Sequence, residues 1–151
     1  SYGHIDGDSA SMAELCALIS SITKLPINQE LAITGSMNQH GEVQSIGGVN
    51  EKIEGFYRLC RDKGLTGSQG VIVPKTNKMN LMLDPDVIEA VEKGEFSIYA
   101  VDHVDQALEL LLGQTAGVAK RDGTYPRKSI HGLAMDKLSY LSDMINGGDG
   151  E

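Results

Sequence analysis

The sequence has little positive charge and no long hydrophobic run. It contains 13 Lys and Arg against 21 Asp and Glu, so its formal net charge at pH 7 is −8. This excess of acid argues against nucleic acid or an anionic membrane as a partner, because both are bound by basic surfaces. No apolar run approaches the length of a membrane span, and the polar start over residues 1–4 has no signal-peptide core. We therefore expect a cytoplasmic protein with no membrane and no nucleic-acid partner.

Cysteine is equally scarce, and histidine follows no ligand pattern. Cys16 and Cys60 each fall on the apolar side of a predicted helix, which favours two buried, reduced thiols. A disulfide is the alternative, although nothing in a chain without a secretion signal suggests one. Neither metal-ligand spacing nor a motif that would activate a cysteine is found among the four histidines, His4, His40, His103 and His131. We therefore expect no metal site.

The chain is long and apolar enough for one compact domain, since it has 151 residues of which 40% are hydrophobic. Apolar spacing and breaker residues predict helices over about 9–24, 49–63, 85–93, 103–112 and 130–146. They predict strands over 30–34, 42–46, 70–74 and 96–101, a hairpin turn at 36–41, and a polar loop or short turn at 75–82. This order indicates an α+β fold, in which a mixed β-sheet is packed with helices.

The end of the chain differs from the rest in composition. Residues 1–113 carry the predicted core, whereas residues 114–129 are polar and aperiodic and are predicted to be a linker. Residues 130–146 predict an amphipathic helix that docks on the domain or on a neighbouring subunit. The glycine-rich residues 147–151 are expected to fray as a flexible tail.

Two short segments place reactive groups at helix starts. Residues 6–11 read Asp-Gly-Asp-Ser-Ala-Ser, and Ser9 stands where this turn enters the first helix. Residues 46–52 read Ile-Gly-Gly-Val-Asn-Glu-Lys, and Lys52 stands in the first turns of the second helix. A hydroxyl and an amine so placed can act as nucleophile and general base, although each alone is more often a helix cap or a solvated cation. Free amides at the first helix start are suited to hold an oxyanion near Ser9, with simple capping as the alternative.

The position of Lys52 on its helix favours the base. At 100° per residue, Lys52 lies between Phe56 and Leu59, on the apolar side. We therefore expect its amine to be buried or to snorkel from an apolar surface. A lysine base must be neutral, which near neutral pH requires a pKa about three units below the free value of roughly 10.4. An apolar pocket can supply such a shift.

These motifs carry a family resemblance. The run Asp-Gly-x-Ser-Ala, then Thr-Gly, then Gly-Gly-x-x-x-Lys, resembles the proteolytic domain of the Lon ATP-dependent proteases, from about Asp6 to about Leu112. The resemblance implies that Ser9 is the nucleophile, that Lys52 is its base, and that Thr34 hydrogen-bonds the lysine. It gives Asp6 a weaker, supporting role. The implied fold is the α+β Lon proteolytic fold, which is similar to domain 2 of ribosomal protein S5.

Two residues depart from the family pattern beside the nucleophile. The family often has proline just before the serine and glycine two residues after it, where this sequence has Asp8 and Ser11. Asp8 adds a carboxylate next to Ser9, and Ser11 adds a second hydroxyl. The sequence alone does not say whether these changes tune the site or weaken it.

The resemblance also implies a function and an assembly. It implies a serine endopeptidase that hydrolyses unfolded or damaged proteins and forms a homo-oligomeric, hexameric ring. This chain would be the C-terminal piece of a longer protein or a fragment of its domain, with residues 1–113 as the C-terminal portion of the proteolytic domain, and ATP and Mg²⁺ would serve only an upstream ATPase module. No cofactor is expected here, and no Gly-x-x-x-x-Gly-Lys-Ser/Thr phosphate loop is present. Two alternatives stay open: a ring-forming assembly module with little or no autonomous proteolysis, and a non-proteolytic acyl hydrolase.

Overall fold

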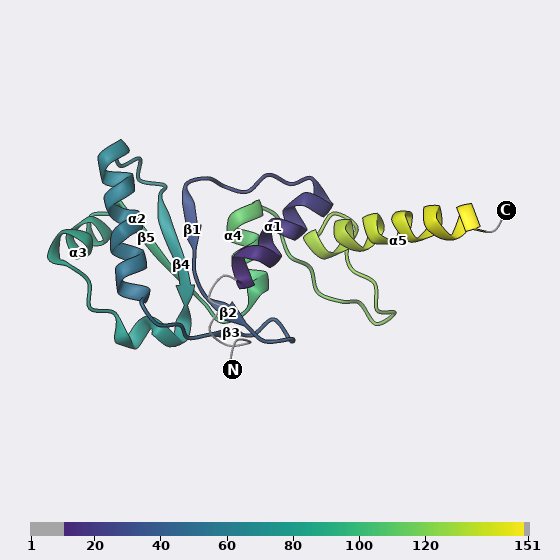
Figure 1. Ribbon diagram of the computed structural model, residues 1–151, viewed down its shortest axis with the longest axis horizontal. Helices are drawn as coiled ribbons and strands as arrows, with labels where there is room; N and C mark the ends of the chain where they lie inside the picture. Colours follow the sequence, from purple (N-terminus) through teal and green to yellow (C-terminus); the bar gives the residue numbers. More distant parts are fainter. Residues whose placement is uncertain (1–10, 150–151) are drawn as a thin grey trace.

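The computed structural model describes residues 11–149, and a three-stranded parallel sheet forms the centre of this part (Figure 1). The strands are β1 (Leu31–Ile33), β4 (Gly70–Pro74) and β5 (Ser97–Val101), in the spatial order β1-β4-β5. All five residues of the central strand β4 are buried. A parallel strand with helices on both faces is expected to read as a continuous apolar run, as Val-Ile-Val does here.

Two pairs of helices cover the two faces of the sheet. Val71 and Val73 pack against α2 (Val49–Lys63) and α3 (Pro85–Glu92), whereas Ile72, with the opposite orientation, packs against α1 (Ser11–Thr23) and α4 (Val104–Leu112). Figure 1 shows these helices on either side of the strands. The α+β prediction is confirmed, and α2 has the bounds predicted from the sequence.

The predicted hairpin is present but pairs differently. Its strands are β2 (Ser36–Met37) and β3 (Val43–Gln44), which form a separate antiparallel sheet. The predicted strand over 30–34 is instead the parallel partner of β4. Gly35 lies between β1 and β2, and its φ of 143° ends β1 and turns the chain into β2.

Residues 75–82, predicted as a polar loop or short turn, include the 3₁₀ helix η2 (Lys75–Asn80). This helix follows β4 directly and buries the side chain of Asn77, which is 4% exposed. Between residues 11 and 149, no helix is both long and apolar enough to cross a membrane.

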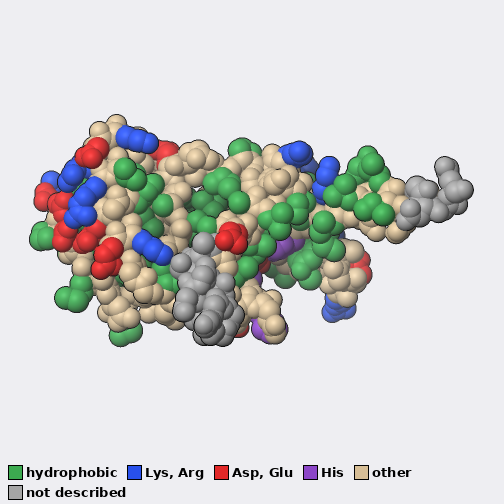
Figure 2. Space-filling view, viewed as in Figure 1, with side chains coloured by type: hydrophobic (Ala, Val, Ile, Leu, Met, Phe, Trp, Pro, Cys, Tyr) green, Lys and Arg blue, Asp and Glu red, His purple; other side chains and the backbone are tan. Residues whose placement is uncertain are grey.

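The C-terminal segment after α4 is irregular up to α5 (Ile130–Asp149), which continues three residues past the predicted helix end at 146. Its start is tied to the preceding segment: the N–H of Ile130 donates to Thr115 O at 2.9 Å and that of His131 to Ala116 O at 3.0 Å. The first turns of α5 pack against α1, and the rest projects from the body (Figure 1). Figure 2 shows apolar side chains along this projecting part, where Leu138, Leu141, Met144 and Ile145 are exposed.

Candidate active site

Thr34 and Lys52, the candidate residues within the described part of the chain, lie toward the carboxyl end of the parallel sheet. Thr34 directly follows β1, and the starts of α1 and α2 point toward the same end as the tip of β4 (Figure 1). In sheets of parallel strands, ligands bind outside the carboxyl ends of the strands. These three segments therefore lie where a ligand site is expected.

The start of α1 lies against the residue that follows Thr34. A Cβ added to Gly35 would come within 2.9 Å of Met12 Cε, and Met12 is fully buried. The first residue of α1, Ser11, accepts a hydrogen bond on its Oγ from the N–H of Met37 at 3.2 Å. The predicted nucleophile Ser9 and the supporting Asp6, with Asp8, lie outside the described residues.

Thr34 is a buried hydroxyl without a partner. Its side chain is 7% exposed, and its backbone N–H donates to Ile72 O at 3.0 Å. Among the side chains of the described residues, Thr34 Oγ1 is the single buried nitrogen or oxygen that makes no hydrogen bond. Leaving such a group unpaired costs about 1–3 kcal/mol. A cost of this kind, retained at a residue that the sequence motifs single out, marks Thr34 as a candidate for function.

Lys52 lies in the first turns of α2, after the Gly-Gly turn. Gly48 precedes the helix in the left-handed region, with φ 71°, and its carbonyl accepts from the N–H of Lys52 at 3.1 Å. Lys52 is exposed, so the prediction that its amine is buried is wrong, and the alternative that it snorkels from an apolar surface stays a prediction.

The helix explains this error. The residues of α2 that are buried form a stripe: Val49, Ile53, Tyr57 and Cys60. At 100° per residue, Lys52 lies roughly 95° from the centre of this stripe. Its neighbour Leu59, an apolar residue that widened the predicted stripe, is 59% exposed. The packed face is therefore narrower than the apolar face of the sequence.

Sequence reasoning missed Asn77. The N–H of Ile46 donates to Asn77 Oδ1 and Asn77 Nδ2 donates to Ile46 O, both at 3.0 Å. The amide thus pairs with the backbone just before the Gly-Gly turn, 31 residues away. An asparagine within a polar stretch gives no signal for such a contact in the sequence.

Neither cysteine is suited to act as a nucleophile. Cys16 and Cys60 are buried and free, which confirms the expected pair of reduced thiols and excludes the disulfide alternative. Burial raises the pKa of Cys16 to about 12, and it raises the pKa of Cys60 as well. A buried thiol that stays protonated is unreactive.

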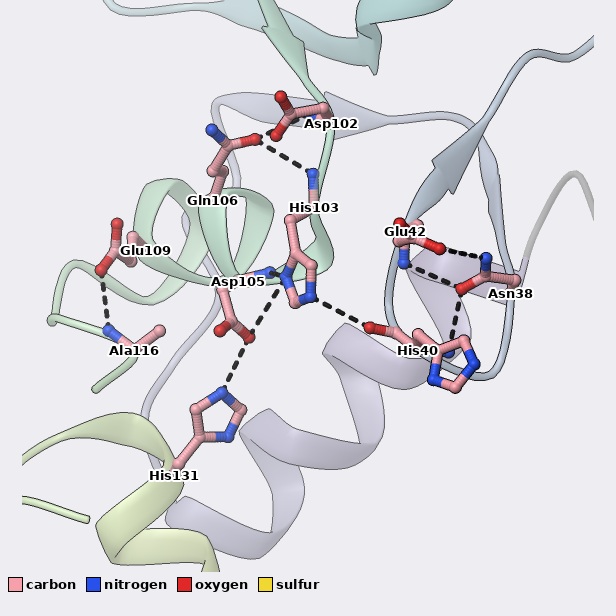
Figure 3. A network of polar contacts seen from close by, with 10 residues as sticks. All are labelled: Asn38, His40, Glu42, Asp102, His103, Asp105, Gln106, Glu109, Ala116 and His131. Carbon is pink, nitrogen blue, oxygen red and sulfur yellow. Dashed lines mark hydrogen bonds and ion pairs between the residues drawn. The ribbon is translucent and has the colours of Figure 1, made fainter. Parts of the chain in front are cut away.

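The histidines of the described part tie elements together (Figure 3). His103 caps α4: its Nδ1 accepts from the N–H of Asp105 at 3.0 Å, so its proton is on Nε2, which donates to His40 O at 3.1 Å. His131 joins α5 to α4 through a 2.7 Å bond from Nε2 to Asp105 Oδ1. Within residues 11–149, no three His, Cys, Asp or Glu side chains are grouped as metal ligands.

Comparison of the sequence with known proteins identifies its relatives. The family model described as the Lon protease (S16) C-terminal proteolytic domain matches residues 4–114. A Lon protease homolog of Escherichia coli (strain K12) is 57% identical over 112 residues, 74% of this chain and 19% of that protein.

Two further relatives match more of the chain. A Lon protease homolog of Haemophilus influenzae is 48% identical over 143 residues, 95% of this chain and 24% of that protein. An archaeal Lon protease of Halobacterium salinarum is 36% identical over 138 residues, 91% of this chain and 18% of that protein. The chain thus spans only 18–24% of the length of these three relatives. With its motifs, its fold and the family model in agreement, the chain belongs to the Lon protease (S16) C-terminal proteolytic domain family.

Proposed function

We propose that this chain is the peptide-hydrolysing part of a serine endopeptidase that acts on unfolded or damaged proteins through a Ser9–Lys52 dyad. Ser9 Oγ attacks the scissile carbonyl carbon while Lys52 Nζ takes the hydroxyl proton, and Lys52 then delivers that proton to the leaving amine. Membership of a proteolytic-domain family supports this chemistry.

The unpartnered hydroxyl of Thr34 is the observation that carries the proposal. A neutral amine has one lone pair, which must point at the serine to accept its proton. If Thr34 Oγ1 accepts an N–H from Lys52 Nζ, the amine is held with its lone pair directed away from Thr34. The buried hydroxyl then gains the hydrogen bond that it lacks among the described residues.

The exposure of Lys52 sets a condition on this mechanism. An amine in water keeps its proton near neutral pH, and exclusion of water favours the neutral form that a base requires. The bound substrate polypeptide therefore covers Lys52 in this proposal, so that the base becomes competent when the substrate is in place. The free amides at the start of α1 hold the oxyanion, and Asp6 has a supporting, positioning role.

The setting of the enzyme follows the family resemblance. Proteolysis is coupled to an ATPase module outside this chain, where ATP and Mg²⁺ bind, and the active form is a homo-oligomeric, hexameric ring in the cytoplasm. The relatives are four to five times longer than the part that this chain matches, which leaves room for such a module.

A second candidate function is a ring-forming assembly module with little autonomous proteolysis. The observation that favours it is the apolar face of the projecting half of α5, where Met144 and Ile145 are 58% and 66% exposed. Light scattering on the isolated chain tests it, since a strict monomer over a wide concentration range would exclude autonomous assembly.

The nucleophile is tested with two serine variants of the full-length protein. Ser9→Ala is expected to abolish both cleavage of an unfolded protein and labelling by a serine-directed covalent probe. Ser11→Ala is the matched control, because the Ser11 hydroxyl is already engaged by the N–H of Met37; it should keep the labelling. Normal cleavage by Ser9→Ala or by Lys52→Ala would show that the dyad is assigned wrongly. Profiling of ester and peptide substrates separates the acyl-hydrolase alternative.

A further inference from the structure

We infer that Asn77 is a positioning residue for Lys52, which it holds in register with Thr34 through the backbone of Ile46. This inference rests on the proposed function. Ile46 stands immediately before the Gly-Gly turn, and its N–H and C=O each bond to the Asn77 amide at 3.0 Å. A side chain that pairs with both groups of one residue fixes the plane in which the turn begins.

The Gly-Gly turn makes such a tie necessary. Glycine has no Cβ and visits many backbone conformations, and a Cβ at Gly47 would meet nothing within 4 Å. Ile46 and Val49 pack against the core on either side of the turn, but the two glycines between them leave the path of the turn open to several conformations. Lys52 follows Ile46 by only six residues, so an error in the path of this turn moves the amine directly.

Asn77 is part of a series of hydrogen bonds, here named the η2 ladder, that joins residues 45–54 to residues 76–84. Its other members are Ser45 Oγ to Thr76 Oγ1 at 2.6 Å, Met82 N to Asn50 Oδ1 at 2.9 Å, Asn50 Nδ2 to Asn80 O at 3.4 Å, and Asp84 N to Glu54 Oε2 at 2.7 Å. Of the side chains in the ladder, Asn77 alone is buried. Bonds sheltered from water hold geometry better than exposed ones, so Asn77 carries most of the positioning.

Strand β4, which leads directly into η2, also makes contact with Thr34. The backbone N–H of Thr34 donates to Ile72 O, and Gly35 lies within reach of Pro74. Asn77 follows Pro74 by three residues, so β4 with η2 is one frame to which Thr34 and the start of α2 are both attached. Removing the Asn77 amide loosens the attachment of the start of α2 to that frame and leaves Thr34 in place.

A matched pair of variants separates positioning from plain stability. Gln69 has the same kind of buried bridging amide at the amino end of β4, where it accepts from Thr66 N at 2.9 Å and donates to Gly64 O at 3.4 Å. We expect Asn77→Ala and Gln69→Ala to lower the Tm of the full-length protein by similar amounts. Asn77→Ala should lower kcat about 10- to 100-fold with KM within about 2-fold, because a misplaced base affects the chemical step. Gln69→Ala should keep kcat within about 2-fold of the wild type.

The Lys52→Ala variant in the same assay distinguishes failure of the proposed function from failure of the inference about Asn77. A normal kcat for Lys52→Ala would overturn the proposed function, and this inference with it. A lost kcat for Lys52→Ala, with equal kcat values for Asn77→Ala and Gln69→Ala, would overturn the inference alone. If Asn77→Ala does not fold, Asn77→Asp replaces it, because aspartate keeps the acceptor for the N–H of Ile46 and loses only the donor to Ile46 O. It should lower kcat by about 3-fold or more, and a wild-type kcat in the folded variant would overturn the inference.

Discussion

The two ends of the parallel sheet are built from similar parts but treat their polar groups differently. At the amino end, the buried Gln69 amide is bonded on both sides, and the Thr66 hydroxyl donates to Glu30 Oε2 at 2.6 Å. At the carboxyl end, the buried Thr34 hydroxyl has no partner among the described residues, and Lys52 stands exposed beyond a Gly-Gly turn. In the proposed function, the group left unpaired at the carboxyl end takes part in the reaction, whereas the paired groups at the amino end stabilise the fold.

The largest expected difference is between two lysines of one helix. Lys52 lies in the first turns of α2 and Lys63 is its last residue, at the opposite end of the sheet, and both side chains are exposed. Lys52→Ala should lower kcat at least about 1000-fold, because no base is left for Ser9, whereas Lys63→Ala should change kcat by less than about 2-fold. Steady-state cleavage by the full-length protein measures both. Equal kcat values for the two variants would contradict the assignment of the reaction to the carboxyl end of the sheet.

The next effect is a gain of stability with a loss of activity. Thr34→Val replaces the unpartnered hydroxyl with a methyl group of similar size, so the free energy of unfolding should rise by about 1 kcal/mol. The same change should lower kcat about 10- to 100-fold, because nothing then orients the Lys52 amine. Urea denaturation and steady-state kinetics provide the two numbers. A destabilised variant with normal kcat would mean that Thr34 is an ordinary structural residue.

At the amino end, a substitution is expected to change stability without changing activity. A Cβ at Gly70 would lie 2.5 Å from Ser97 O, so Gly70→Ala should lower the free energy of unfolding by about 1–3 kcal/mol. The kcat of the folded fraction should be unchanged. Gly55→Ala is the control, because a Cβ there meets nothing within 4 Å and alanine in a helix stabilises by about 0.5–1 kcal/mol. A loss of kcat in folded Gly70→Ala would show that the amino end also supports the reaction.

The smallest expected effect concerns the buried thiol of Cys16. Burial raises its pKa to about 12 in the folded protein, so the unfolded chain loses the thiol proton first. Its contribution to stability is complete below pH 9 and is lost as the pH rises from about 9 toward 12. Between pH 7 and pH 10, the free energy of unfolding should fall by about 1.4 kcal/mol more in the wild type than in Cys16→Ala. Parallel curves from urea titrations at several pH values would contradict this assignment.

Local signals made much of the fold predictable. Glycines flank α2 on both sides, so its bounds could be read from the sequence, and the breakers on both sides of the Val-Ile-Val run favoured a buried strand. The pairing of β1 was not predictable in this way, because its partner β4 lies beyond α2. The break at Gly35 became evident only once the φ of that residue was known.

The candidate site was less predictable than the fold. The motifs identified Thr34 and Lys52 as residues, but the helical periodicity counted Leu59 as core, and this placed Lys52 on the packed face of α2, although both residues are exposed. The role of Asn77 depends on a contact across 31 residues. Both features depend on how distant segments pack together, so neither could be read from the residues next to Lys52 or Asn77.

The most direct test is an experimental structure of the full-length protein with a serine-directed inhibitor or a peptide analogue bound. The account predicts that Lys52 Nζ lies about 2.6–3.2 Å from both Ser9 Oγ and Thr34 Oγ1, with the ligand covering the amine. A well-ordered complex in which the Lys52 amine still points into water, away from Ser9, would contradict the account.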